Sequence, residues 1–149
     1  MKQILIFALV SISISTLSSF SSQKEKTYSL TVEVSDLHNS KGVVQFALYN
    51  KDGTIPDEDY KNCCKILKEK IHNGSSKITF SNLPQGKYAV NILHDENENG
   101  EIDKGFFLPI EGIGFSNFQS IGFSNRPNFS KASFDLNCDK KIAVKVIYM

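Results

Sequence analysis

The chain has 149 residues, with 17 lysines and arginines against 16 aspartates and glutamates, so its net charge is close to zero. A balanced charge without a basic run gives no reason to expect a nucleic acid or an anionic membrane as partner. The length is that of one domain with a single hydrophobic core.

The first 22 residues have the pattern of a secretory signal peptide. Lys2 supplies a positive start, residues 4–14 are mostly apolar, and serines follow at 18, 19, 21 and 22. The segment is too short and too rich in serine for a typical transmembrane helix, although an uncleaved anchor is the alternative. Cleavage near residues 19–23 leaves one domain, residues 23–149, without a membrane span. We expect it to be secreted, periplasmic or in the cell envelope, where thiols oxidise.

Alternating side chains predict the first two strands. A turn at residues 36–42 separates the two runs, so we expect them to pair as an antiparallel hairpin. The apolar members are Tyr28, Leu30, Val32 and Val34 in the first run and Val44, Phe46 and Leu48 in the second.

Residues 57–70 fit either a helix or a strand. Acidic residues directly after Pro56 favour the first turn of a helix, whereas residues 65–72 suit a strand equally well. We expect a helical turn over residues 59–64, followed by a strand.

The next strands lead into a row of polar residues. Ile78 and Phe80 begin a short strand, residues 82–86 predict a tight turn, and residues 88–94 alternate again. His94 points away from Asp95 by strand alternation, so we expect it to anchor the loop by hydrogen bonds and not to bind a metal.

Residues 95–103 resemble the first part of a calcium-binding loop, with oxygen-bearing side chains at every second place and Gly100 sixth. These side chains are Asp95, Asn97, Asn99, Glu101 and Asp103. The twelfth place, a bidentate glutamate in an EF-hand, is Phe106. The pattern predicts a weakly bound calcium ion on a β-framework, with Glu111 as a further ligand. A plain Asn-Gly hairpin turn is the alternative.

A segment rich in phenylalanine and glycine follows this loop. The pentapeptide Ile-Gly-Phe-Ser-Asn occurs at residues 113–117 and again at 121–125. Two copies do not make a repeat fold, so we expect a long ordered loop whose phenylalanines cover the core. Final strands are expected at residues 132–136 and 142–148. Their inward side chains are Phe134, Leu136, Ile142, Val144, Val146 and Tyr148. About seven short strands with at most a short helical turn predict an all-β sandwich.

The chain has three cysteines, Cys63, Cys64 and Cys138. Adjacent cysteines rarely pair without strain, so a disulfide from Cys138 to either neighbour is geometrically easier. The remaining thiol is then free, metal-bound or bridged to another chain. Their spacing is not that of a zinc site.

Four motifs, in this order, resemble a known family. They are Asn-Leu-Pro-Gln-Gly-Lys-Tyr-Ala-Val at residues 82–90, the polar row at 94–103, Pro-Ile-Glu-Gly-Ile-Gly-Phe-Ser-Asn at 109–117, and Pro-Asn-Phe at 127–129 before Ala-Ser-Phe. Together they are similar to an exported bacterial family named domain of unknown function 2141, over residues 28–148. The resemblance implies an immunoglobulin- or transthyretin-like antiparallel β-sandwich and no established activity. The second pentapeptide and the three cysteines depart from the family pattern.

The expected function is that of a calcium-stabilised binding or structural module at the cell envelope, with an unknown partner. No catalytic motif is present, and a calcium loop accounts for the local acids, so we expect no enzyme. One alternative is a carbohydrate- or protein-binding module without metal, with exposed aromatic residues such as Phe106, Phe118 or Phe123. The other is a hydrolase with two carboxylates converging in a cleft.

Overall fold

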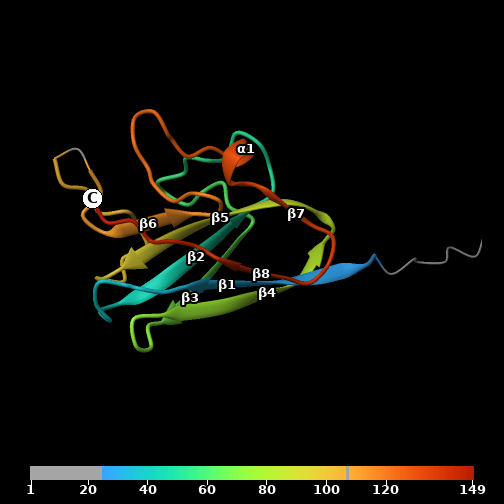
Figure 1. Ribbon diagram of the computed structural model, residues 1–149, viewed down its shortest axis with the longest axis horizontal. Helices are drawn as coiled ribbons and strands as arrows, with labels where there is room; N and C mark the ends of the chain where they lie inside the picture. The colour runs from blue at the N-terminus through green and yellow to red at the C-terminus, as the bar shows by residue number, and fades with distance from the viewer. Residues whose placement is uncertain (1–24, 107) are drawn as a thin grey trace, which may run out of the picture.

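A computed structural model describes residues 25–106 and 108–149 (Figure 1). The predicted signal peptide lies outside the described residues. The described part of the chain forms eight strands and one short helix. In chain order these are β1 (Thr27–Val34), β2 (Val43–Tyr49), β3 (Lys65–Lys70), β4 (Ser76–Pro84), β5 (Gly86–Asp95), β6 (Gly112–Phe115), α1 (Phe129–Ala132), β7 (Phe134–Leu136) and β8 (Lys140–Ala143).

The first sheet has three strands in the order β4-β1-β8. β1 runs antiparallel to β4, with Val32 opposite Ile78, and parallel to β8, with Val32 opposite Ile142. Every second residue of β1 from Leu30 onward is buried, and the residues between are half-buried. The predicted alternation is confirmed, and it gives this sheet one buried face.

The second sheet has the order β3-β2-β5-β6, and β7 pairs with the start of β5. Its two central strands are buried on both faces, β2 over residues 44–49 and β5 over residues 88–95. One face packs against the first sheet, and the loops before β3 and after β6 cover the other. This second sheet is therefore the middle layer of the molecule.

Two hydrophobic cores follow from this arrangement. The first core lies between the sheets and includes Leu30 and Phe80 from one sheet and Phe46 and Ile92 from the other. The second core lies on the outer face of the second sheet. It comprises Ala47, Tyr49, Ile55, Tyr60, Ala89, Leu93, Ile113, Phe115, Phe118, Phe129 and Ala132. The prediction of an all-β sandwich is confirmed, whereas its immunoglobulin- or transthyretin-like subtype stays a prediction.

The predicted hairpin between the first two strands is wrong, because β1 and β2 lie in different sheets. β2 is buried on both faces: Phe46 and its alternate neighbours enter the first core, while Ala47 and Tyr49 enter the second. A strand of this kind needs cover on both sides, which only the middle layer supplies. The link over residues 35–42 therefore crosses from one sheet to the other.

The predicted helical turn over residues 59–64 is also wrong, whereas the strand after it, β3, is confirmed. The Asp57 carboxylate accepts the backbone N–H groups of Lys61 and Asn62, at 3.2 and 2.8 Å, and the Asn62 side chain at 3.2 Å. A side-chain acceptor thus takes backbone donors that a helix would use, and the segment folds as a loop. The short helix α1 forms later in the chain.

The C-terminal runs confirm their predicted inward faces, since all six side chains lie in or against the first core. Of the second run, only the start belongs to a strand, because β8 ends at Ala143. Farther on, Ile147 bridges to Ile113 of β6, so the chain end passes from the first sheet to the second. The predicted turn at residues 82–86 is shorter than expected, because β4 continues to Pro84 and β5 begins at Gly86. Among the described residues, no helix is long and apolar enough to span a membrane.

Candidate functional site

Loop 95–103 begins at the last residue of the central strand β5, as predicted. The Asp95 side chain is fully buried there. Its Oδ2 accepts the backbone N–H of Gly100 at 2.9 Å and the Lys68 ammonium at 3.0 Å. Its Oδ1 is buried and has no hydrogen-bond donor among the described residues. One oxygen of a buried carboxylate is therefore left for another partner.

Asn97, Asn99 and Asp103 converge at the tip of the loop. The Asp103 carboxylate accepts the side-chain amide N–H groups of Asn97 at 2.6 Å and Asn99 at 3.0 Å. The two amide oxygens accept backbone N–H groups two residues farther on, at 3.0 and 2.9 Å. Positive φ angles of 63° at Glu98 and 82° at Gly100 wind the chain tightly enough for these contacts.

Glu111 holds both ends of the loop. Its Oε1 accepts the backbone N–H of Glu96 at 2.9 Å and its Oε2 accepts that of Asp103 at 3.3 Å. Burial raises the pKa of Glu111, while these two N–H donors work in the opposite direction. The carboxylate thus contacts the loop through the backbone, from a segment that follows it in the chain.

The base of the loop is fixed by buried hydrogen bonds. His94 is fully buried, and its ring nitrogens contact the Tyr148 hydroxyl at 2.6 Å and the Lys41 carbonyl oxygen at 3.1 Å. The predicted role of His94 as an anchor is confirmed. Gln45, on β2, donates to the Gly100 carbonyl oxygen at 3.4 Å.

A second buried polar group without a partner is the Tyr60 side chain. The Tyr60 hydroxyl is buried and has no hydrogen-bond partner among the described residues. Burial raises the pKa of Tyr60, and the nearby charges of Asp95 and Glu111 add to the rise. Asp95 and Tyr60 thus each have a buried polar atom without a hydrogen-bond partner among the described residues.

The six predicted metal ligands are not arranged alike. Three contact one another at the loop tip, two contact the loop backbone, and the Glu101 residue is exposed. No three His, Cys, Asp or Glu side chains of the described residues group closely enough to hold a metal ion. An ion here would therefore use amide and backbone carbonyl oxygens beside carboxylates. These hard oxygen donors suit calcium, and the free Asp95 oxygen fits this role.

Sequence reasoning missed Lys68, which lies on the edge strand β3. Its ammonium forms an ion pair with the buried Asp95 across 27 positions of sequence. No local pattern connects the two residues. Only the pairing of β3 with β2, and of β2 with β5, brings them together.

All three cysteines are free thiols in the structure. The Cys63 and Cys64 thiols donate to the backbone oxygens of Tyr60 and Leu48, at 3.0 and 3.2 Å, and Cys138 is exposed. Burial raises the pKa of both neighbouring thiols. Pairing of Cys138 with either of them stays a prediction for an oxidising compartment.

Of the three aromatic residues that were predicted to be exposed, two are exposed and one is buried. Phe106 and Phe123 are 91% and 92% exposed, whereas Phe118 is 4% exposed and packs edge-to-face against Phe115 in the second core. Single exposed rings are normal on a protein surface, whereas contiguous exposed apolar patches mark interaction sites.

The model of a family described as an uncharacterized protein conserved in bacteria (DUF2141) matches residues 32–144. The chain belongs to this family. The matched part of this DUF2141 protein runs from β1 to just beyond β8 and contains the whole of loop 95–103. Comparisons with curated proteins and with solved structures find no match. The family assignment therefore brings no activity with it.

Proposed function

We propose that this DUF2141 protein is an exported, non-catalytic β-sandwich in which calcium rigidifies loop 95–103 and the segment after it. The ordered loop then presents a binding surface at the cell envelope. The observation that carries the calcium part is the buried Asp95 Oδ1, which has no donor among the described residues.

A buried carboxylate is stable only when its charge and its lone pairs are matched. The Lys68 ammonium and the Gly100 N–H donate hydrogen bonds to Asp95 Oδ2, but no group among the described residues donates one to Oδ1. A divalent cation would satisfy that oxygen and neutralise the remaining charge of the loop. The unpaired Oδ1 therefore supports calcium binding beside Asp95.

The loop tip also supports this proposal. The Asp103 carboxylate draws two amide N–H groups toward itself, from Asn97 and Asn99. Each amide oxygen accepts one backbone N–H and keeps a second lone pair, which a cation beside Asp103 could use. With the Glu101 backbone carbonyl in the seventh place, the loop would then offer several oxygens without further charged residues.

Thermal unfolding with calcium, with magnesium and with a chelator tests this proposal. We expect calcium to raise the free energy of unfolding by about 1–3 kcal/mol at roughly ten to a hundred times its Kd. Magnesium should act much more weakly, because it requires a tight octahedron. Asp95→Ala should abolish the calcium effect. Glu98→Gln is the matched control, because it removes a loop charge from an exposed position outside the alternating ligand places.

Lys68 provides a second, independent test. Because its ammonium competes with a cation for Asp95, Lys68→Met should bind calcium more tightly and show a larger thermal shift. Equal melting temperatures in calcium and in chelator, for the wild type and for Lys68→Met, would remove calcium from the proposal.

A metal-free binding module is the second candidate. The strong exposure of Phe106 and Phe123 favours it, because neither ring needs an ion to be presented. This candidate predicts that replacing both rings by serine abolishes partner capture equally in calcium and in chelator.

A further inference from the structure

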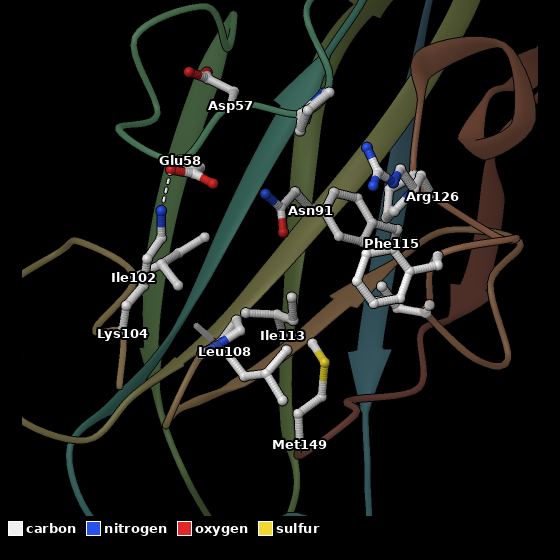
Figure 2. A pocket seen from close by; sticks show the side chains of 16 residues that line it. Asp57, Glu58, Asn91, Ile102, Lys104, Leu108, Ile113, Phe115, Arg126 and Met149 are labelled. Atoms are coloured by element: carbon white, nitrogen blue, oxygen red, sulfur yellow. Dashed lines mark hydrogen bonds and ion pairs between the residues drawn. The ribbon is translucent and has the colours of Figure 1, made fainter. Parts of the chain in front are cut away.

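A pocket of about 570 Å³ opens on the outer face of the second sheet (Figure 2). Its walls are mainly apolar and come from three loops, strand β6 and the chain end. They include Pro56, Ile102, Leu108, Phe115, Phe123 and Met149. The volume lies within the range of about 300–1,000 Å³ that small-molecule sites occupy.

Asn91 lies on the sheet surface at the base of this pocket, and Figure 2 shows its amide directed between the apolar side chains. The residue belongs to the central strand β5 and is 1% exposed. Neither its amide oxygen nor its amide nitrogen has a hydrogen-bond partner among the described residues. Buried amides are almost always paired, so a wholly unpaired one in a pocket points to a ligand.

Neighbouring polar groups do not satisfy this amide. The Tyr49 hydroxyl is close enough to Asn91 for the amide to lower the Tyr49 pKa, against the larger rise caused by burial and by Asp57, but the two side chains do not form a hydrogen bond. That hydroxyl donates to Asp57 Oδ2 at 3.3 Å. At the rim, Glu58 forms an ion pair with Lys104. The Arg126 guanidinium lies over the Phe123 ring, 5.5 Å from its centroid.

We propose that this pocket binds a small, uncharged, mainly apolar molecule whose amide group pairs with the Asn91 side chain. The Asn91 amide presents a donor and an acceptor side by side, and a ligand amide presents the complementary pair. A carboxylate would offer two acceptors and a buried charge, and an amine would offer only donors. The apolar walls disfavour a sugar, which needs several polar partners. The inference does not rest on calcium.

The unpaired amide also makes a prediction about the free protein. Replacing a buried, unpaired polar group by an apolar group of similar size is neutral or stabilising. Asn91→Leu should therefore melt at the same temperature as the wild type or higher. An amide serving only to hold the fold together would instead lower the melting temperature on replacement.

Calorimetric titration with octanamide, octanoate and octylamine tests the ligand class. We expect the wild type to prefer octanamide by about tenfold over the other two, from two neutral hydrogen bonds. Asn91→Leu should bind octanamide about tenfold more weakly, and its preference should disappear. Asn91→Ala gives the same comparison if the leucine variant folds poorly. Met149→Ala, which trims only an apolar wall, is the control and should weaken all three probes alike.

Each titration is run in calcium and in chelator, so that this inference and the proposed function are judged separately. Binding of octanamide in chelator supports the pocket whatever the ion does. Failure of the wild type to bind octanamide in either condition would overturn it, as would an unchanged preference in Asn91→Leu. Tighter binding of octyl glucoside than of octanamide would overturn the amide class.

Discussion

The two copies of Ile-Gly-Phe-Ser-Asn, at residues 113–117 and 121–125, have the same sequence and different structures. In the first copy, Phe115 is 4% exposed and ends strand β6 in the second core. Ser116 accepts the Val90 backbone N–H at 2.9 Å and donates to the Ala132 carbonyl oxygen at 2.7 Å. The first copy thus joins the central strand to the covering loop.

The second copy forms an exposed turn that has few contacts with the rest of the chain. Gly122 and Asn125 exchange two backbone hydrogen bonds, at 3.4 and 3.0 Å, and the Asn125 side chain donates to the Ser120 carbonyl oxygen. Phe123 is 92% exposed. Its ring lies at the pocket, beneath the Arg126 guanidinium.

The difference shows that these five residues do not encode their own conformation. The first copy can extend because β5 offers a free edge for pairing, with Asn91 opposite Phe115 and Leu93 opposite Ile113. Once that edge is taken, the second copy has no strand to pair with, and its glycine and asparagine close a turn.

Replacing the phenylalanine of each copy by alanine should give the largest difference between the copies in the free energy of unfolding. Phe115→Ala removes a buried ring from the second core, so we expect the free energy of unfolding to fall by about 3–5 kcal/mol. Phe123→Ala, the matched control, should change it by less than about 0.5 kcal/mol because the ring is exposed. Urea unfolding measures both, and equal losses would contradict the comparison.

Replacing the glycine of each copy by alanine should give the second largest difference in the free energy of unfolding. A Cβ on Gly114 would lie 2.5 Å from the Lys145 carbonyl oxygen, whereas one on Gly122 meets nothing within 4 Å. Because the obstacle is backbone, Gly114→Ala should lower the free energy of unfolding by about 1–3 kcal/mol. Gly122→Ala should leave it almost unchanged. A tolerated alanine at Gly114 would show that the chain end packs more loosely than described.

The serines give the smallest expected difference. Ser116→Ala leaves the buried Val90 N–H without its acceptor, so we expect a loss of about 1–2 kcal/mol in the free energy of unfolding. Ser124 is exposed, and Ser124→Ala should have an effect close to zero. Faster amide hydrogen exchange at Val90 in Ser116→Ala alone would identify the lost bond as the cause.

Much of the fold could be predicted because strand patterns are local. The alternation of β1, the inward residues of the C-terminal runs and the position of loop 95–103 at the end of β5 all come from short stretches of sequence. His94 was assigned correctly for the same reason, since strand alternation alone turns it away from Asp95. The predicted helical turn over residues 59–64 was wrong because Asp57 captures the backbone donors that such a turn would have used.

The candidate site was less predictable, because its decisive contacts join distant residues. Lys68 reaches Asp95 only through the strand order of the second sheet, and Glu111 folds back on the loop from a later segment. Asn91 did carry a signal: it is the polar member of an otherwise apolar face with Ala89 and Leu93. That signal has meaning only once this face is known to be buried.

The sequence by itself determined which side chains share a face and where the oxygen-rich loop begins, because both depend on the two-residue period of an extended chain. The tertiary structure alone decided which strands pair, which of two identical pentapeptides is buried, and which polar groups stay without partners. Those outcomes depend on burying two faces of one sheet at once, and the free energy of that burial is summed over residues far apart in the chain.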